Sequence, residues 1–493
     1  FMVAALGVAL AFAVVGGQLV RLALRGQNEP TTNLSQAVPT NIARPDIVDR
    51  NGRLMASDVE VPSLYADPAL VIDRDEVAEK LARVLADVDE AEVRRLLEDR
   101  SRRFVWLRRG LSPRLAQAVH NLGLPGLAFR RELRRVYPAG RLAGHLIGAV
   151  NVDNKGIAGL ERYLDETGAV EPVHGATLTD RAPLRSSIDL GVQHALDEEL
   201  AGAIGRYEAK GAAGVVLDAV TGEVVAAQSL PGVDPARPGE LMDEARQDKL
   251  LGGVYELGSI MKMVTVAMAL DGGDVRADTV LDVRQPLEAG RYTIRDPHPA
   301  GRPLTVAEIF VRSSNVGSGL LALAAGAERQ RGILGRLGLI EPMKTEAGLA
   351  AAPLLPVNAA HSQNGERAPW GRIETITLAY GHGIALAPLQ FAAAAASLVN
   401  GGTRVVPTFL RRNGSETATT AVVSAETSRG MRALLRRNVT DPAGTGRLAD
   451  AQGYRVGGKT GTAEMPARGG YRESAVISSF LAAFPMEAPR YVA

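Results

Sequence analysis

A buried helix is predicted for residues 259–270, Ser-Ile-Met-Lys-Met-Val-Thr-Val-Ala-Met-Ala-Leu, because they are apolar on nearly every side until Asp271-Gly-Gly273 ends the run. Lys262 is unexpected there, since an uncompensated buried ammonium is costly. Burial shifts lysine toward its neutral amine form, and Ser259, three residues earlier, projects from the same helix face. A neutral amine can take the proton of a serine hydroxyl and make it a nucleophile. The alternative is a lysine that reaches solvent from the helix end.

Lysine is scarce in this chain and accounts for seven of the 56 basic residues. Arginine, which supplies the others, cannot be deprotonated, so a lysine retained at position 262 favours a chemical role. Gly258 allows another backbone or a substrate to approach closely. Free N–H groups at the helix start can stabilise a developing oxyanion. The sequence therefore predicts a serine nucleophile, Ser259, with Lys262 as its base.

A second lysine lies in Gly457-Gly-Lys459-Thr460-Gly461-Thr462, which is expected to be a strand. Glycines on both sides of the Lys-Thr pair leave the strand edge open, so that a substrate backbone can lie beside it. Lys459 and the two hydroxyls of Thr460 and Thr462 can then hold a carboxylate. The alternative for this segment is a hairpin turn.

Two segments can supply a hydroxyl and an amide between these elements, Ser313-Ser-Asn315 and Ser362-Gln-Asn364. The first follows Thr305-Val-Ala-Glu308, a capping box that begins a helix, and precedes another apolar run. It is therefore expected at a turn between two buried helices, where both side chains can be held rigidly. We prefer Ser313 and Asn315, and interpret Ser362 and Asn364 as ordinary loop residues.

Composition excludes several other classes of protein. The 493 residues are 46% apolar and 23% charged, with a net charge of +1. This is a globular composition of about three domains, and it provides no positive field to attract nucleic acid. Cysteine is absent, and the seven histidines show no pair at metal-ligand spacing, so neither disulfides nor a zinc site is expected.

The amino terminus is predicted to be a membrane anchor. Residues 1–20 carry no charge, and about 20 apolar residues suffice for a helix to cross a bilayer. A cleaved signal peptide and a buried core helix are the alternatives. Arg21 and Arg25 follow the run, so the positive-inside rule alone would place the bulk of the chain in the cytoplasm. The anchor is assigned to residues 1–25 and a polar, proline-containing linker to residues 26–43.

The remainder is expected to be α+β, with an antiparallel sheet packed between helices in its larger part. A mixed α/β domain is expected at residues 44–182, with a hairpin around Asn51-Gly52, helices at 75–87 and 90–99, a short helix from Ser112, and strands at 104–107 and 127–136. The larger domain is expected at residues 183–493. Its elements are a helix capped by Asp189, a hairpin at 214–227, helices near 259–271, 305–325 and 387–399, and strands near 454–462 and 475–484.

The order S-x-x-K, S-x-N, K-T-G is similar to the signature of penicillin-binding transpeptidases and serine β-lactamases. The motifs and the residues that flank them resemble the class B penicillin-binding proteins most closely, and among them the division-specific FtsI-type peptidoglycan D,D-transpeptidases. The resemblance rests on residues 255–262, 312–317, 380–383, 388–390 and 453–462, and upstream on 49–52, 124–126, 137–140, 145–148 and 151–156.

The resemblance implies a role for each site residue. Ser259 would attack the penultimate D-alanine of a stem peptide and release the last D-alanine, with Lys262 as general base. Ser313 would relay the proton, and Asn315 would hold the acyl-side amide. Lys459, Thr460 and Thr462 would bind the terminal carboxylate, and Gly461 between them would belong to the substrate-binding segment. The N–H groups of Ser259 and Thr462 would form the oxyanion hole, and no metal or organic cofactor is implied.

The resemblance also implies a location and partners. It places a single inner-membrane span at the amino terminus, the catalytic domain in the periplasm at the division septum, and the pedestal and span against an FtsW-type glycan polymerase. A stem-peptide amine would be the acceptor, and β-lactams would acylate the same serine. The family continues beyond the strand that begins at Tyr491, so a protein ending at Ala493 is expected to be less stable than a longer one.

Alternatives of other classes remain at this point. An elongation-type class B transpeptidase would carry the same motifs. A β-lactamase or penicillin sensor is disfavoured, because no glutamate can be assigned as a deacylating base and residues 44–182 would be surplus. A non-catalytic division scaffold is disfavoured, because such a protein gains nothing from a buried lysine beside Ser259.

Overall fold

The computed structural model describes residues 15–16, 41–173, 181–356, 370–412, 420–467 and 470–493. The predicted anchor at 1–25, apart from two residues, lies outside this range, as do Ser362 and Asn364. Within it, no helix combines the length and the apolar character that crossing a membrane requires. The last residues of the predicted linker form strand β1 (Asn41–Ala43), which pairs with β6 (Glu171–Val173).

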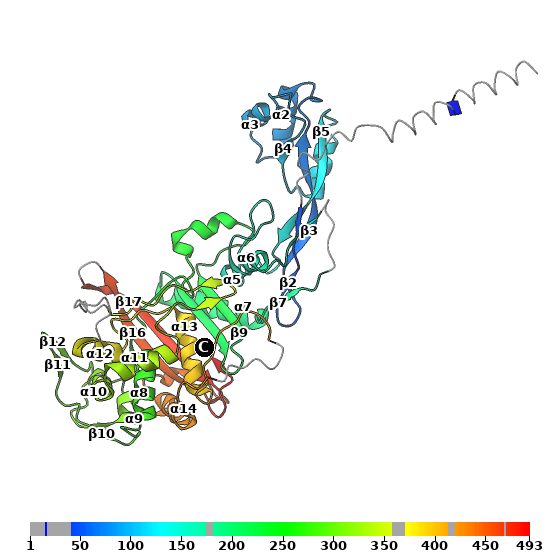
Figure 1. Ribbon diagram of the computed structural model, residues 1–493. Coiled ribbons are helices and arrows are strands. Elements are labelled where there is room, and N and C mark those ends of the chain that lie inside the picture. Colours follow the sequence, from blue (N-terminus) through cyan, green and yellow to red (C-terminus); the bar gives the residue numbers. More distant parts are fainter. Residues whose placement is uncertain (1–14, 17–40, 174–180, 357–369, 413–419, 468–469) are drawn as a thin grey trace, which may run out of the picture. The chain divides into compact units, whose positions relative to one another are not determined.

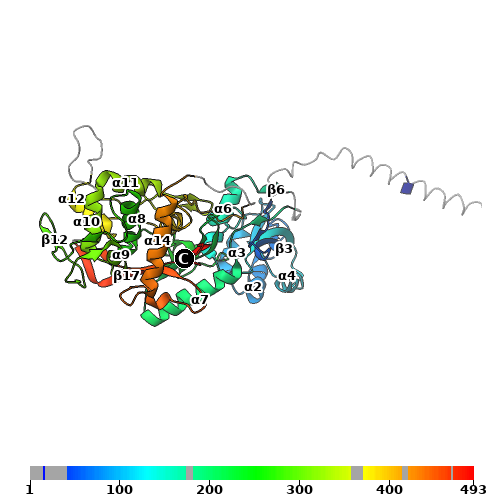
Figure 2. The same ribbon diagram turned by 90° about the horizontal axis from the view of Figure 1, so that it is seen from below.

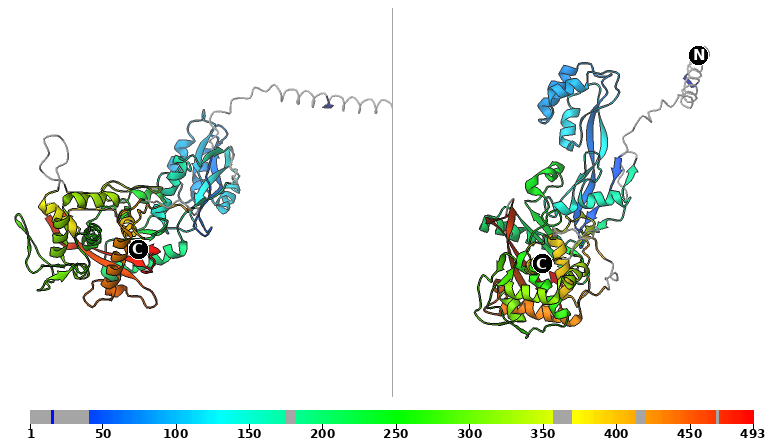
Figure 3. Two further views of the ribbon diagram at one scale, coloured as in Figure 1. Left: turned by 60° about the horizontal axis from the view of Figure 1, so that its bottom comes forward. Right: turned by 60° about the vertical axis from the view of Figure 1, so that its left-hand side comes forward.

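The chain forms two compact units. One includes Glu60–Leu133, and the other includes Arg44–Val59, Arg134–Glu171 and the chain from Leu178 onward. The predicted domain at 44–182 therefore contributes residues to both units. Figures 1 and 3 colour the chain from blue at low residue numbers to red at high ones, which allows each unit to be followed by itself.

The smaller unit packs three short helices around a core that includes Leu64, Leu81 and Val93. The helices are α2 (Arg74–Val84), α3 (Glu90–Leu96) and α4 (Pro113–His120), and the strand between the last two is β4 (Val105–Arg108). Side-chain oxygens of the residues before the helices accept their first free N–H groups, as capping requires. The predicted helices at 75–87 and 90–99 and the helix from Ser112 are confirmed, each within a few residues.

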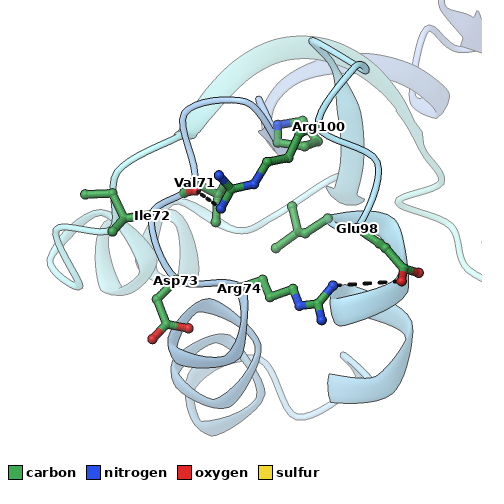
Figure 4. Close-up of a pocket in the computed structure, with 8 residues that line it drawn as sticks. Val71, Ile72, Asp73, Arg74, Glu98 and Arg100 are labelled. Carbon is green, nitrogen blue, oxygen red and sulfur yellow. Dashed lines mark hydrogen bonds and ion pairs between the residues drawn. The ribbon is translucent and has the colours of Figure 1, made fainter.

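A pocket of about 440 Å³ opens in the smaller unit beside the start of α2 and the end of α3 (Figure 4). Arg74 reaches Glu98 at 4.0 Å, and Arg100 donates to the carbonyl oxygen of Val71 at 3.4 Å. These cationic side chains that line the pocket thus have partners within it. None of the residues with predicted catalytic roles lies in this unit.

The hairpin predicted around Asn51-Gly52 is present, but its second strand is much longer than expected. β2 (Ile47–Val48) pairs with β3 (Leu54–Ala66), which also pairs with β4 and with β5 (Leu127–Val136). β2 pairs in parallel with β7 (Leu184–Arg185).

The larger unit is built on an antiparallel sheet, as predicted, and this sheet has five strands. Its strands, in order across the sheet, are β16 (Gly457–Ala467), β17 (Gly470–Phe484), β18 (Tyr491–Val492), β8 (Ala212–Asp218) and β9 (Val224–Leu230). β16, which carries the K-T-G segment, lies at one edge and pairs with β17 alone among these strands. Its other edge is therefore available for a substrate backbone.

Helices cover this sheet in the larger unit (Figures 1 and 2). They are α5 (Gly144–Ile147), α6 (Gly159–Glu166), α7 (Leu190–Tyr207), α8 (Lys262–Asp271), α9 (Val306–Val311), α10 (Asn315–Ala325), α11 (Ala327–Arg336), α12 (Arg372–Ala379), α13 (Pro388–Val399) and α14 (Ala425–Thr440). α7, capped by Asp189 as predicted, packs on β8 and β9, and α13 packs on β8, β17 and β18. The central helix, α8, contacts α10, α13 and α14.

A buried ionic cluster joins residues 44–59 to residues 134–171 within the larger unit. Arg44 Nε and Arg135 Nε lie 2.8 and 2.7 Å from the two carboxylate oxygens of Glu161, and Arg135 Nη1 lies 3.3 Å from Asp58 Oδ1. These four side chains are at most 3% exposed. Removing one member of such a cluster leaves an uncompensated buried charge, so the cluster depends on all of its members.

Candidate active site

The segment from Gly258 to Asp271 places Ser259 and Lys262 together. The prediction of a helix from 259 needs one correction: residues Gly258–Met261 form a 3₁₀ turn, and α8 begins at Lys262. A 3₁₀ turn brings residues i and i+3 nearly in line, and the Lys262 Nζ atom donates to Ser259 Oγ at 3.1 Å. Lys262 is fully buried, whereas Ser259 is half-buried. The lysine therefore does not extend to solvent, and the serine can be approached from outside.

Oxygen atoms surround the Lys262 amine. Nζ lies 2.6 Å from the Ser313 carbonyl oxygen, 3.0 Å from Ser313 Oγ and 2.7 Å from Asn315 Oδ1. Burial is the main cause that lowers the pKa of Lys262 well below its ordinary value; the positive charge of Lys459 lowers it further, and the negative charge of Asp296 opposes both. A neutral amine in this position has a lone pair that can accept the Ser259 hydroxyl proton.

Ser313 and Asn315 lie at the turn between α9 and α10, where they were predicted. The capping box of Thr305 and Glu308 begins α9. Ser313 has φ of +59°, a left-handed conformation that is unusual for serine. Ser314 then caps α10 by accepting from the N–H of Gly317 at 2.9 Å. The strained residue is thus held between two packed helices, as strained residues at functional sites are.

Lys459 approaches the same serine from β16. Its Nζ atom donates to Ser313 Oγ at 3.0 Å and to the Thr460 carbonyl oxygen at 3.0 Å. Lys459 is fully buried, and burial lowers its pKa to about 7. Ser313 Oγ therefore lies 3.0 Å from each of two lysine amines. Thr460 is half-buried and Thr462 is exposed, and strand alternation directs both to the face opposite Lys459.

Two glycines allow the Ser259 turn to touch the backbone of β16. At Gly258, with φ of +58°, a Cβ atom would lie 2.3 Å from the Thr462 carbonyl oxygen. At Gly461 it would lie 2.4 Å from the Leu257 carbonyl oxygen. Real Cβ atoms do not approach other atoms so closely. The sequence predicted that another backbone or a substrate would lie close to Gly258. In the structure this neighbour is the backbone of β16.

Two residues that support the site were not predicted from the sequence. Asn438 on α14 is fully buried, and its Nδ2 donates to the Gly458 carbonyl oxygen at 2.8 Å. Asp296 accepts hydrogen bonds from the Ser314 hydroxyl and the Val316 N–H. Neither stands in a recognisable motif. In the part of the chain that the structure describes, no cluster of three metal-ligating side chains occurs.

Comparison with known proteins gives two family matches. Residues 212–493 match the penicillin-binding protein transpeptidase domain, and residues 39–213 match the penicillin-binding protein dimerisation domain. Together these matches cover every described residue from Asn41 onward.

Individual relatives agree with the family matches. The chain is 38% identical over 456 residues to "Probable peptidoglycan D,D-transpeptidase FtsI" of Caulobacter vibrioides, covering 91% of this chain and 74% of the relative. It is 30% identical over 476 residues to "Peptidoglycan D,D-transpeptidase FtsI" of Escherichia coli, covering 90% and 77%. The crystal structure of penicillin-binding protein 2X from Streptococcus thermophilus shares the fold, with a TM-score of 0.70 and 21% identity over 92% of this chain and 75% of that one.

Proposed function

The chain belongs to the FtsI-type class B penicillin-binding proteins, and on that premise we propose that it is a peptidoglycan D,D-transpeptidase with Ser259 as its nucleophile. It cross-links stem peptides of peptidoglycan. The observation that carries the role of Ser259 is the fully buried Lys262 amine 3.1 Å from the serine hydroxyl. An amine kept from water next to an accessible hydroxyl is suited to remove its proton.

In the first half of the reaction Ser259 Oγ attacks the carbonyl carbon of the penultimate D-alanine, while its proton passes to Lys262. The N–H groups of Ser259 and Thr462 stabilise the oxyanion of the tetrahedral intermediate, since the contact at Gly258 holds the two backbones together. The C–N bond then breaks, the last D-alanine leaves as the amine, and an ester to Ser259 remains.

Ser313 delivers the proton to the leaving amine. Its hydroxyl lies 3.0 Å from the Lys262 amine, which holds the proton, and 3.0 Å from the Lys459 amine. The proton can therefore pass from Lys262 through Ser313 to the departing nitrogen. The fixed left-handed turn at Ser313 keeps this hydroxyl between the two lysines.

In the second half an amine of a neighbouring stem peptide attacks the ester. A new amide bond forms, the bond to Ser259 Oγ breaks, and the serine recovers a proton that the attacking amine loses through the same groups. Thr460, Gly461 and Thr462 bind the donor along the open edge of β16, and Asn315 holds its acyl-side amide. The Lys459 amine is buried against Ser313, on the face of β16 opposite Thr460 and Thr462. Its positive charge therefore attracts the terminal carboxylate from that opposite face.

The cellular setting is also a proposal. Residues 1–25 anchor the protein in the inner membrane, the two described units lie in the periplasm, and an FtsW-type glycan polymerase is the partner at the division septum. The uncharged run at residues 1–20 and the FtsI names of the relatives support this setting. Depletion of the protein should give filaments that fail to divide; rounded cells would indicate a role in elongation instead.

Labelling with a fluorescent penicillin tests the chemistry. The wild-type protein should form one stable covalent adduct per chain, and Ser259→Ala should form none while keeping its melting temperature. The absence of an adduct on folded wild-type protein would favour a non-catalytic scaffold. Rapid loss of the label with many turnovers of penicillin would favour a β-lactamase.

A further inference from the structure

Asp296 lies in the segment that follows β12 (Tyr292–Ile294), and its carboxylate contacts the turn that carries Ser313 and Asn315. Oδ2 accepts from the Ser314 hydroxyl at 2.7 Å, and Oδ1 accepts from the Val316 N–H at 2.9 Å. We propose that Asp296 is a positioning residue of the transpeptidase: it holds this turn so that Ser313 and Asn315 place the Lys262 amine against Ser259. This inference rests on the proposed function.

The turn needs an outside support. Ser313 has φ of +59°, and a non-glycine residue persists in that conformation only where its surroundings fix it. Ser314 and Asn315, which follow Ser313, are both hydrogen-bonded to the segment after β12. Asn315 Nδ2 donates to the Arg295 carbonyl oxygen at 3.4 Å, and the Ser314 hydroxyl donates to Asp296. The Ser314 hydroxyl is also the cap of α10, so Asp296 orients the cap as well.

The position of Lys262 depends on that turn. Three of the four oxygens around its amine belong to Ser313 and Asn315. If the turn moved by 1 Å, the amine would lose its hydrogen bonds or follow them away from Ser259. Displacements of about 1 Å cost reaction rates up to about a hundredfold in such sites.

The charge of Asp296 provides a second, separable effect, because its carboxylate binds Ser314 and Val316 on either side of Asn315, whose Oδ1 lies 2.7 Å from the Lys262 amine. Two charged groups act on the Lys262 amine, Lys459 on β16 and Asp296 in the segment after β12; a third titratable group, His382 after α12, lies close enough that the charge of Lys262 lowers its pKa. Of these, Asp296 is the one that raises the pKa of Lys262. Removing its charge should therefore lower that pKa further, and a neutral amine would be available at lower pH.

Two substitutions separate the two effects. Asp296→Asn keeps an oxygen for the Val316 N–H and a polar group for Ser314 but removes the charge, whereas Asp296→Ala removes both. The rate of acylation by a fluorescent penicillin would be measured against pH, with melting temperatures for each protein. Asp282→Asn is the control, because Asp282 is exposed and its carboxylate pairs with Arg284 rather than with a residue of the turn.

We expect Asp296→Asn to keep the plateau rate within about threefold and to move the acid limb of the profile to lower pH. Asp296→Ala should lower the plateau at least tenfold, and the control should change neither. An unmoved acid limb in Asp296→Asn overturns the electrostatic effect, and an unchanged plateau in Asp296→Ala overturns the positioning role. If the wild-type protein is not acylated at all, the proposed function fails instead, so the two failures are distinguishable.

Discussion

Substituting Gly258 with alanine should misplace the Thr462 backbone and slow acylation of Ser259. The new Cβ atom would lie 2.3 Å from the Thr462 carbonyl oxygen, while ordinary contacts begin at 3.4 Å. The strand or the turn must therefore move by about 1.1 Å. A shift of this size between nucleophile and oxyanion donors is expected to reduce the acylation rate about a hundredfold.

The same substitution should also destabilise the protein by two separate terms. Alanine at the Gly258 φ of +58° costs about 1–2 kcal/mol, and forcing a methyl group into packed backbone costs about 1–3 kcal/mol more. Gly453→Ala is a matched control, because Gly453 also has a positive φ, of +84°, but a Cβ atom there meets nothing within 4 Å. The control should show the first term alone and acylate normally.

The assay combines urea denaturation with the time course of fluorescent penicillin labelling, measured well below the melting temperature of each variant. The expected order of stability is wild type, then Gly453→Ala, then Gly258→Ala, with slow labelling in the last alone. If Gly258→Ala labels within threefold of the wild-type rate, then Thr462 is not a part of the oxyanion site that this contact holds in place.

Three further results are expected. Lys262→Arg should lower the acylation rate by about 10²–10⁴-fold, because arginine cannot act as a base; a labelling time course within tenfold of wild type would contradict this. Burial lowers the pKa of Lys459 to about 7 from the 10.5 of the unfolded chain, so the unfolded chain binds more protons between these values and the free energy of unfolding should rise with pH across that window. Lys459→Met should reduce that rise by up to about 1.4 kcal/mol per pH unit in urea titrations, and equal slopes would refute the assignment. Arg135→Met should cost about 3–5 kcal/mol of unfolding free energy because its two carboxylate partners stay buried, whereas Arg284→Met, which breaks an exposed pair, should cost at most about 1 kcal/mol.

The local parts of the site could be predicted from the sequence. The spacing of Ser259 and Lys262 fixes their relation within one turn, and the capping box at Thr305 marks the start of α9. The distinction between a 3₁₀ turn and an α-helix at 258–261 could not be predicted, because it depends on the contact of Gly258 with β16. Similar limits apply to β3, whose extension to Ala66 depends on its partners.

The long-range parts of the site could not be predicted from residue spacing. Ser313 and Lys459 are 146 residues apart, and nothing in either segment indicates that the serine hydroxyl lies between two amines. α14 was not predicted either, although its buried residues Met431, Leu434, Leu435 and Val439 recur at helical spacing and indicate an amphipathic helix. Its place in the protein follows from packing on β16, which only the folded chain provides.

Strand β18 also constrains the order in which the protein can be assembled. Tyr491 and Val492 join Phe484 and Ala483 on one side to Asp218 and Leu217 on the other. On a ribosome that adds about 5–20 residues per second, β8 therefore waits tens of seconds for the strand that completes its sheet. Before β18 is made, α8 can already be packed. The hairpin of β16 and β17, which binds the donor peptide, then has no strand that joins it to the hairpin of β8 and β9. We therefore expect penicillin reactivity only after Tyr491 and Val492 have been synthesised, whatever the helices formed earlier have achieved.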